Sequence, residues 1–230
     1  MTRLILRKKI MRINADFSQA AIVDRSKAEW ISSPESGVDR IMLDRIGDEV
    51  ARATSIVRYA AGSSFARHEH AKGEEFLVLD GVFSDDHGDY PPGFYVRNPP
   101  GSGHSPYSLG GCRILVKLRQ FDPQDLTRVV IDTHEAKLWR SGGSADSLAL
   151  HAFGNEQVRM IRIAAERTYA LAGDSAGAEI FVVSGSIRFD GEELPAESWL
   201  RLPAGQPADL EAREDSVLWE KCGHLPTTPI

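Results

Sequence analysis

The chain has 230 residues, of which 42% are hydrophobic and 26% charged, which is enough apolar material for one large domain or two smaller ones. A net charge of −6 argues against a nucleic-acid-binding protein, and no apolar run approaches the ~18 residues of a membrane span. Two cysteines are too few for a disulfide framework or a four-cysteine zinc site. We therefore expect a cytoplasmic protein.

We predict that residues 1–20 form an N-terminal extension. A basic cluster around Lys8 and Lys9 is typical of a solvated tail, and the first ten residues lack the apolar core of a signal peptide. The sequence does not decide whether translation starts at Met1 or at Met11.

Short runs that alternate apolar and polar side chains follow along the rest of the chain, separated by glycine and proline. These runs are residues 55–60, 76–79, 94–97, 113–117, 158–163 and 180–183. Such alternation is typical of antiparallel strands. Helix signals are weak and confined to the first fifty residues and to the segment around 122–139. We therefore predict an all-β sandwich or barrel with few helices.

The chain repeats itself at an offset of 104 residues. Between residues 58 and 101, 13 of 44 positions are identical to their partners in 162–205 without a gap. A repeat of this kind predicts two homologous domains in tandem. We place the first at residues 21–121 and the second at 122–230.

Three histidines and a glutamate in the first copy form a candidate metal site. They lie in the pattern Gly62-x5-His68-x-His70-x3-Glu74, with His104 following a proline-glycine turn. Residues two apart on a strand share one face, so His68 and His70 would lie side by side. Imidazole nitrogens and a carboxylate suit zinc, iron(II), manganese, nickel or copper. The ion and one glutamate would leave a charge near +1, which favours an anionic ligand.

An isolated His-x-His pair can equally be a surface or core feature, but the repeat argues for a site. At the offset of 104, the four candidate ligands become Ala172, Asp174, Ala178 and Ala208 in the second copy. Glu75 instead survives as Glu179, which indicates that Glu75 is architectural and Glu74 is the ligand. The second copy is therefore predicted to be a degenerate domain without metal ligands.

These spaced motifs resemble those of the cupin superfamily, whose members are small jelly-roll β-barrels. The resemblance predicts two tandem cupin barrels, a bicupin. Residues 58–117 look more narrowly like the cupin-like domain of the anti-sigma factor ChrR, and 73–90, 97–104 and 111–117 carry the likeness. Ser108 departs from the pattern, because the motif usually ends in asparagine there. The resemblance implies that His68, His70, Glu74 and His104 are metal ligands, with zinc as the ion.

The relative's sigma-binding domain has a His/Cys zinc site of its own. Residues 1–67 here contain neither histidine nor cysteine. We therefore expect no sigma-factor binding.

Two functions stay open, and the sequence does not decide whether the protein is an enzyme. The first is a regulatory or sensor protein that responds to a small molecule or an oxidant. The second is a metal-dependent dioxygenase, because dioxygenases that cleave β-dicarbonyl and related compounds look similar to this cupin subtype. The complete ligand set disfavours a purely structural or storage role, whereas an isomerase or decarboxylase is not excluded. A homodimer is compatible with the sequence but does not follow from it.

Other residues are predicted to be structural. Trp199 and Trp219 fit the core of the second barrel, and Cys112 fits a buried thiol. Arg97, which the second copy keeps as Arg201, fits a structural salt bridge. Aromatic side chains near the ligands, such as Tyr95 and Tyr107, favour core positions over a pocket lining.

Overall fold

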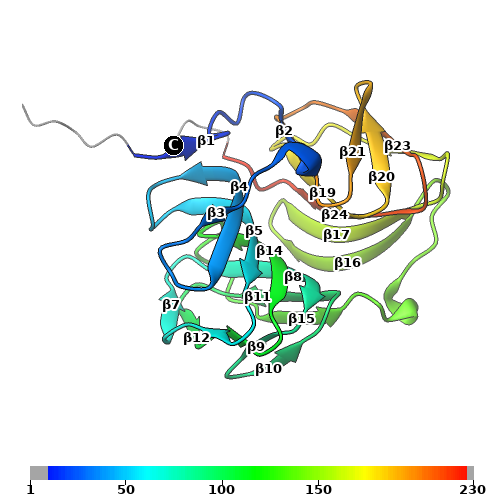
Figure 1. The fold of residues 1–230 in the computed structure, drawn as a ribbon. Coiled ribbons are helices and arrows are strands. Elements are labelled where there is room, and N and C mark those ends of the chain that lie inside the picture. Colours follow the sequence, from blue (N-terminus) through cyan, green and yellow to red (C-terminus); the bar gives the residue numbers. More distant parts are fainter. Residues whose placement is uncertain (1–9, 227–230) are drawn as a thin grey trace, which may run out of the picture.

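The computed structural model describes residues 10–226 and is almost entirely β (Figure 1). Residues 1–9 of the predicted extension lie outside the described part. Within residues 10–226 the only helices are two short 3-10 turns, η1 (Arg25–Lys27) and η2 (Ala136–Leu138). None of the described helices is long and apolar enough to cross a membrane. The predicted all-β fold with few helices is confirmed.

The strands fall into two units. The first unit has a large sheet in the order β1-β4-β5-β14-β8-β11-β15, with β3 added to β4, and two smaller sheets, β10-β9-β13-β6 and β12-β7. Its strands are β1 (Arg12–Ile13), β3 (Ile31–Ser32), β4 (Val38–Ile46), β5 (Arg52–Tyr59), β6 (Ser63–Ser64), β7 (His68–His70), β8 (Glu74–Gly81), β9 (Phe83–Asp85), β10 (Gly88–Tyr90), β11 (Phe94–Asn98), β12 (Ser102–His104), β13 (Tyr107–Ser108), β14 (Cys112–Leu118) and β15 (Val129–Asp132).

The second unit has a large sheet in the order β16-β17-β24-β19-β22-β2 and a smaller one, β18-β23-β20-β21. Its strands are β2 (Ala21–Val23), β16 (Asp146–Phe153), β17 (Glu156–Ile163), β18 (Thr168–Leu171), β19 (Ala178–Ser184), β20 (Ser186–Phe189), β21 (Glu192–Pro195), β22 (Trp199–Leu202), β23 (Ala208–Ala212) and β24 (Ser216–Cys222).

The sequence repeat is also a repeat of structure. Strands β5 and β14 recur as β17 and β24, and both bounds of each strand move by 104 residues. Even the irregularities recur, since β8 skips Leu79 in its pairing with β14, and β19 skips Val183 in its pairing with β24. The two units are therefore copies of one topology.

Two strands pair in one unit although their residues fall in the predicted range of the other. β2, from the N-terminal part of the chain, pairs with β22 in the second unit, while β15, which follows residue 121, pairs with β11 in the first. The predicted boundaries, 21–121 and 122–230, stay a prediction, but the sheets do not divide at a single point of the chain. Of the predicted extension, β1 pairs with β4 of the first unit.

Three apolar clusters fill the molecule. One lies inside each unit, and the third joins their large sheets, with Leu77 and Leu115 from the first unit against Phe181 from the second. Trp199 and Trp219 are buried, as predicted, but they belong to this third cluster. Their predicted position inside the second barrel is therefore wrong, because on these strands the large rings face the other unit.

Reciprocal ion pairs cross the same interface. Lys221 of the second unit donates to Glu75 of the first, and Lys117 of the first unit donates to Glu179 of the second over 2.5 Å. All four side chains are buried. Burial alone would raise the pKa of Glu75, but the charges of Lys221 and Arg97 outweigh it and hold that pKa well below its usual range. The predicted architectural role of Glu75 thus takes the form of a link between units.

Candidate metal centre

Two short strands place the three histidines. β7 and β12 run antiparallel, with His68 directly opposite His104 and His70 opposite Ser102. His68 and His70 lie two residues apart, so their side chains lie on the same face of β7. The pairing therefore gathers three imidazoles at one place.

A tight turn brings Glu74 to the same place. The backbone N–H of Gly73 donates to the carbonyl of His70 over 3.0 Å, and β8 begins at the next residue. Gly73 has a φ of +75°, and a Cβ there would come within 2.4 Å of the Phe121 ring, so glycine is required.

The four predicted ligands converge. His70 Nε2 lies 3.0 Å from His104 Nε2, and Glu74 Oε2 lies 3.3 Å and 3.5 Å from these two nitrogens. The ligand nitrogens of His68, His70 and His104 all lie within 4.8 Å of one another. Atoms that share one ion at bond lengths of about 2.0–2.2 Å lie roughly 3.0–3.6 Å apart, so the spacing of His70, Glu74 and His104 fits a divalent metal. Coordination by these residues stays a prediction.

The site is buried on one side and open on the other. His70, Glu74 and His104 are buried, whereas His68 is exposed. Burial lowers the pKa of His70, which favours the neutral, metal-binding form. Burial would also lower the pKa of His104, but the hydrogen bond with Asp85 and the charge of Glu74 raise it above its usual value.

Two buried polar side chains contact the ligands from behind. Asp85 Oδ2 lies 2.8 Å from His104 Nδ1, and Asn98 Nδ2 donates to Glu74 Oε2 over 3.2 Å. Neither residue was among the predicted site residues. The repeat held the signal, since their counterparts at the offset of 104 are Phe189 and Leu202.

Aromatic rings line the interior next to the site. The Phe65 and Phe83 rings lie 6.4 Å from His68 and 6.0 Å from His104, and Tyr59 packs against both phenylalanines. Tyr95 instead donates to Glu75 over 2.6 Å and is buried in the cluster between the units, so it is a core residue as predicted but, like Trp199, faces the other unit.

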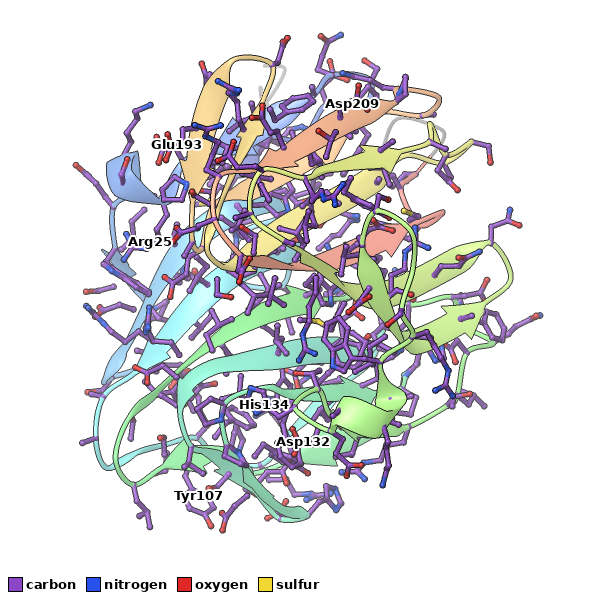
Figure 2. All side chains as sticks on the ribbon, turned by 90° about the vertical axis from the view of Figure 1, so that its right-hand side faces the viewer. Arg25, Tyr107, Asp132, His134, Glu193 and Asp209 are labelled. Carbon is purple, nitrogen blue, oxygen red and sulfur yellow. The ribbon has the colours of Figure 1, made fainter. Side chains whose placement is uncertain are left out.

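The site lies at the end of the first unit that faces away from the second. Figure 1 places β7 and β12 at the bottom, with β20, β21 and β23 of the second unit at the top. Figure 2 likewise places Tyr107, next to the site strands in the chain, at the opposite end from Glu193 and Asp209. The smaller sheet of the second unit therefore lies at the opposite end of the molecule from β7 and β12.

A second cluster, Asp125, His151 and Glu156, also has metal-like spacing. Here the Arg97 guanidinium donates to Asp125 and to Glu156 over 2.7 Å each, and His151 Nε2 lies 2.8 Å from Asp125. A buried cation already satisfies these carboxylates. The cluster is the structural salt bridge predicted for Arg97.

Comparison with known proteins agrees with the fold and with the residues of the first unit. Residues 18–122 match the family model described as the ChrR cupin-like domain. By this match and by its fold, the chain resembles proteins of the cupin superfamily. Its first half resembles the ChrR cupin-like domain, as predicted. No curated protein sequence matches the chain.

Solved structures share the architecture over most of the chain. A putative dioxygenase from Nostoc punctiforme has a TM-score of 0.72 at 14% identity and covers 92% of this chain and 85% of its own. The bacterial pirin YhhW from Escherichia coli, in complex with nickel(II), has a TM-score of 0.68 at 14% identity and covers 91% and 100%. A mutant of oxalate decarboxylase from Bacillus subtilis has a TM-score of 0.61 at 12% identity and covers 90% and 78%. At these identities the likeness establishes the fold alone.

Proposed function

We propose that this protein binds one divalent metal ion through His68, His70, Glu74 and His104, and that the ion holds a small-molecule ligand. The chain would then act as a regulatory protein that responds to a small molecule or an oxidant, without a sigma-binding role. The convergence of three imidazoles and one carboxylate carries the proposal. Zinc is the ion favoured by the resemblance, and iron, manganese and nickel also suit these donors.

The protein's own residues would divide the work by burial. Buried His70, Glu74 and His104 would hold an ion on the side away from solvent. Exposed His68 marks the side from which a ligand can enter. A bound divalent ion supplies Lewis-acid attraction for an oxygen ligand, and a site charge near +1 favours an anionic one.

A second candidate is a metal-dependent dioxygenase that acts on small β-dicarbonyl or related carbonyl compounds. The structural likeness to a putative dioxygenase over 92% of the chain favours it. Iron or manganese prefers about six ligands, so four protein ligands would leave two positions for a chelating substrate and oxygen. No protein nucleophile would be needed. Cytoplasmic location and a homodimer stay predictions under either function.

The test is elemental analysis of protein purified without a metal-affinity tag, together with oxygen uptake on a panel of β-dicarbonyls. Near-stoichiometric zinc without oxygen uptake supports the regulatory role. Iron or manganese with uptake supports the dioxygenase. No metal after reconstitution contradicts both.

Variants test the ligand set itself. His68→Ala combined with His104→Ala should abolish the one ion per chain. The matched control, His87→Ala with His134→Ala, removes two exposed histidines outside the cluster and should retain it. Unchanged metal content in the first variant would contradict the proposed site.

A further inference from the structure

The two contacts behind the ligands form a buried polar layer. Asp85 is 5% exposed and Asn98 is 4% exposed. Asp85 has further partners, because its Oδ1 accepts from the backbone N–H of His87 over 2.8 Å and from the hydroxyl of Tyr90 over 3.3 Å. The carboxylate is therefore fixed from two sides and has little freedom to leave His104.

Asp85 selects one tautomer of His104. An ionised carboxylate only accepts hydrogen bonds, so the Nδ1 atom facing it must carry the proton. The neutral ring then has its lone pair on Nε2, which is the atom that faces His70 and Glu74. The other tautomer would set a lone pair against the carboxylate and a proton in the site.

Asn98 makes a comparable contact with the carboxylate of Glu74. It lies on β11 directly opposite Glu74 on β8, and its amide donates to Oε2. Oε2 is the same oxygen that approaches His70 and His104. The amide thus fixes the position of the atom that a metal would use.

The second unit offers an internal comparison. The counterparts Phe189 and Leu202 are buried in the apolar cluster of that unit, where the candidate ligands are also replaced. Glu75, next to Glu74 on β8, and Arg97, next to Asn98 on β11, are kept as Glu179 and Arg201. The polar layer therefore differs between the units together with the ligands, as expected if it serves them and not the fold.

We propose that Asp85 and Asn98 are positioning residues of the metal centre: Asp85 holds His104 in the tautomer with Nε2 free, and Asn98 holds Glu74 Oε2 in place. This inference rests on the proposed metal-binding function. Hydrogen-bond partners of ligands typically change metal affinity by about 10–100-fold when removed.

The experiment compares Asp85→Asn with Asp86→Asn. Asp86 is a carboxylate in the same turn, but it pairs with Arg67 and the backbone of Ser105. By chelator competition, zinc affinity should fall about 10–100-fold in Asp85→Asn and in Asn98→Leu and less than ~3-fold in Asp86→Asn. The visible spectrum of the cobalt(II) forms should change in the first two variants only. Equal affinities in all variants would overturn the positioning roles while leaving metal binding intact.

A second readout needs no metal. Nitrogen-15 NMR of the histidine rings in the metal-free protein, above the pH at which His104 titrates, should show His104 protonated at Nδ1 in the parent and in Asp86→Asn. Asp85→Asn should populate the Nε2-protonated form. The expected tautomers in a parent that binds no zinc would contradict the proposed function and support the role of Asp85. An Nε2-protonated parent, or no change in Asp85→Asn, would overturn that role.

Discussion

The two units use the same strands for different purposes on opposite faces. Three buried charged side chains that face the other unit are kept in both copies: Glu75 and Glu179, Arg97 and Arg201, Lys117 and Lys221. Both interiors hold an apolar cluster, but the candidate ligands and the polar layer of the first unit are replaced in the second, mostly by apolar residues. Neighbouring residues on a strand point to opposite faces, so one face can change without disturbing the other. The comparison teaches that the interface and the site are separable.

The largest effect is expected at the interface. In Lys117→Met, the hydrogen-bond partners left to Glu179 among the described residues are Trp199 and His224, so a buried charge loses its lysine cation. The free energy of unfolding should fall by about 3–5 kcal/mol. Lys221→Met should cost less, about 1–3 kcal/mol, because Arg97 and Tyr95 still donate to Glu75.

Urea unfolding measures both losses. Glu179→Met added to Lys117→Met should recover most of the stability, since a buried ion pair can often be replaced by apolar groups. A loss in Lys221→Met as large as that in Lys117→Met would mean that Arg97 does not compensate for the missing lysine.

Leu202 and Asn98 occupy corresponding positions in the two units, and we expect that replacing each by the other residue type changes the free energy of unfolding by different amounts. Leu202→Asn places an amide without a partner in an apolar cluster and should cost about 2–3 kcal/mol in urea unfolding. Asn98→Leu should cost less than about 1.5 kcal/mol in the metal-free protein, because only the bond to Glu74 is lost. Similar losses in the two variants would show that the polar layer also stabilises the fold.

Some features of the fold and of the candidate site could be predicted from the sequence, and others could not. Alternation, the repeat and the spaced histidines were enough to predict the β fold and to gather His68, His70, Glu74 and His104, because these signals are local or periodic. The exchange of β2 and β15 was not predictable, since strand pairing across units leaves no mark in spacing. The side toward which Trp199 and Trp219 point was missed for the same reason. An alternating pattern indicates that a side chain is buried, but it does not indicate which other residues pack against it.

A third test concerns acid sensitivity. His224 of the second unit corresponds to Gln120 in the first, and burial lowers the pKa of His224 to about 3 despite its bond to Glu179. Between pH 7 and 5 the unfolded imidazole takes up a proton and the folded one does not, so stability falls as pH falls. The contribution is about 1–2 kcal/mol across this window.

His224→Gln should remove that part of the pH dependence of unfolding in urea. The control, His87→Gln, changes an exposed ring and should leave the slope unaltered. An unchanged slope in His224→Gln would mean that the buried ring is protonated in the folded protein.

The smallest change in the free energy of unfolding is expected at Cys112, where the corresponding residue of the second unit is similar in size. Cys112 is a buried thiol, as predicted, and burial raises its pKa to about 11. Its counterpart Ser216 donates to the carbonyl of Ser186, and the matching carbonyl in the first unit, that of Val82, accepts from Ser108.

A carbonyl oxygen has two lone pairs, so a serine at position 112 can share the carbonyl of Val82 with Ser108. Cys112→Ser should therefore change the free energy of unfolding by less than about 1 kcal/mol and should be at least as stable as Cys112→Ala. If the serine variant is the weaker of the two, the added hydroxyl has found no partner. The side chains at the starts of β14 and β24 would then differ in geometry even though the two strands pair alike. In that case the two units would not be equivalent at the ends of these strands.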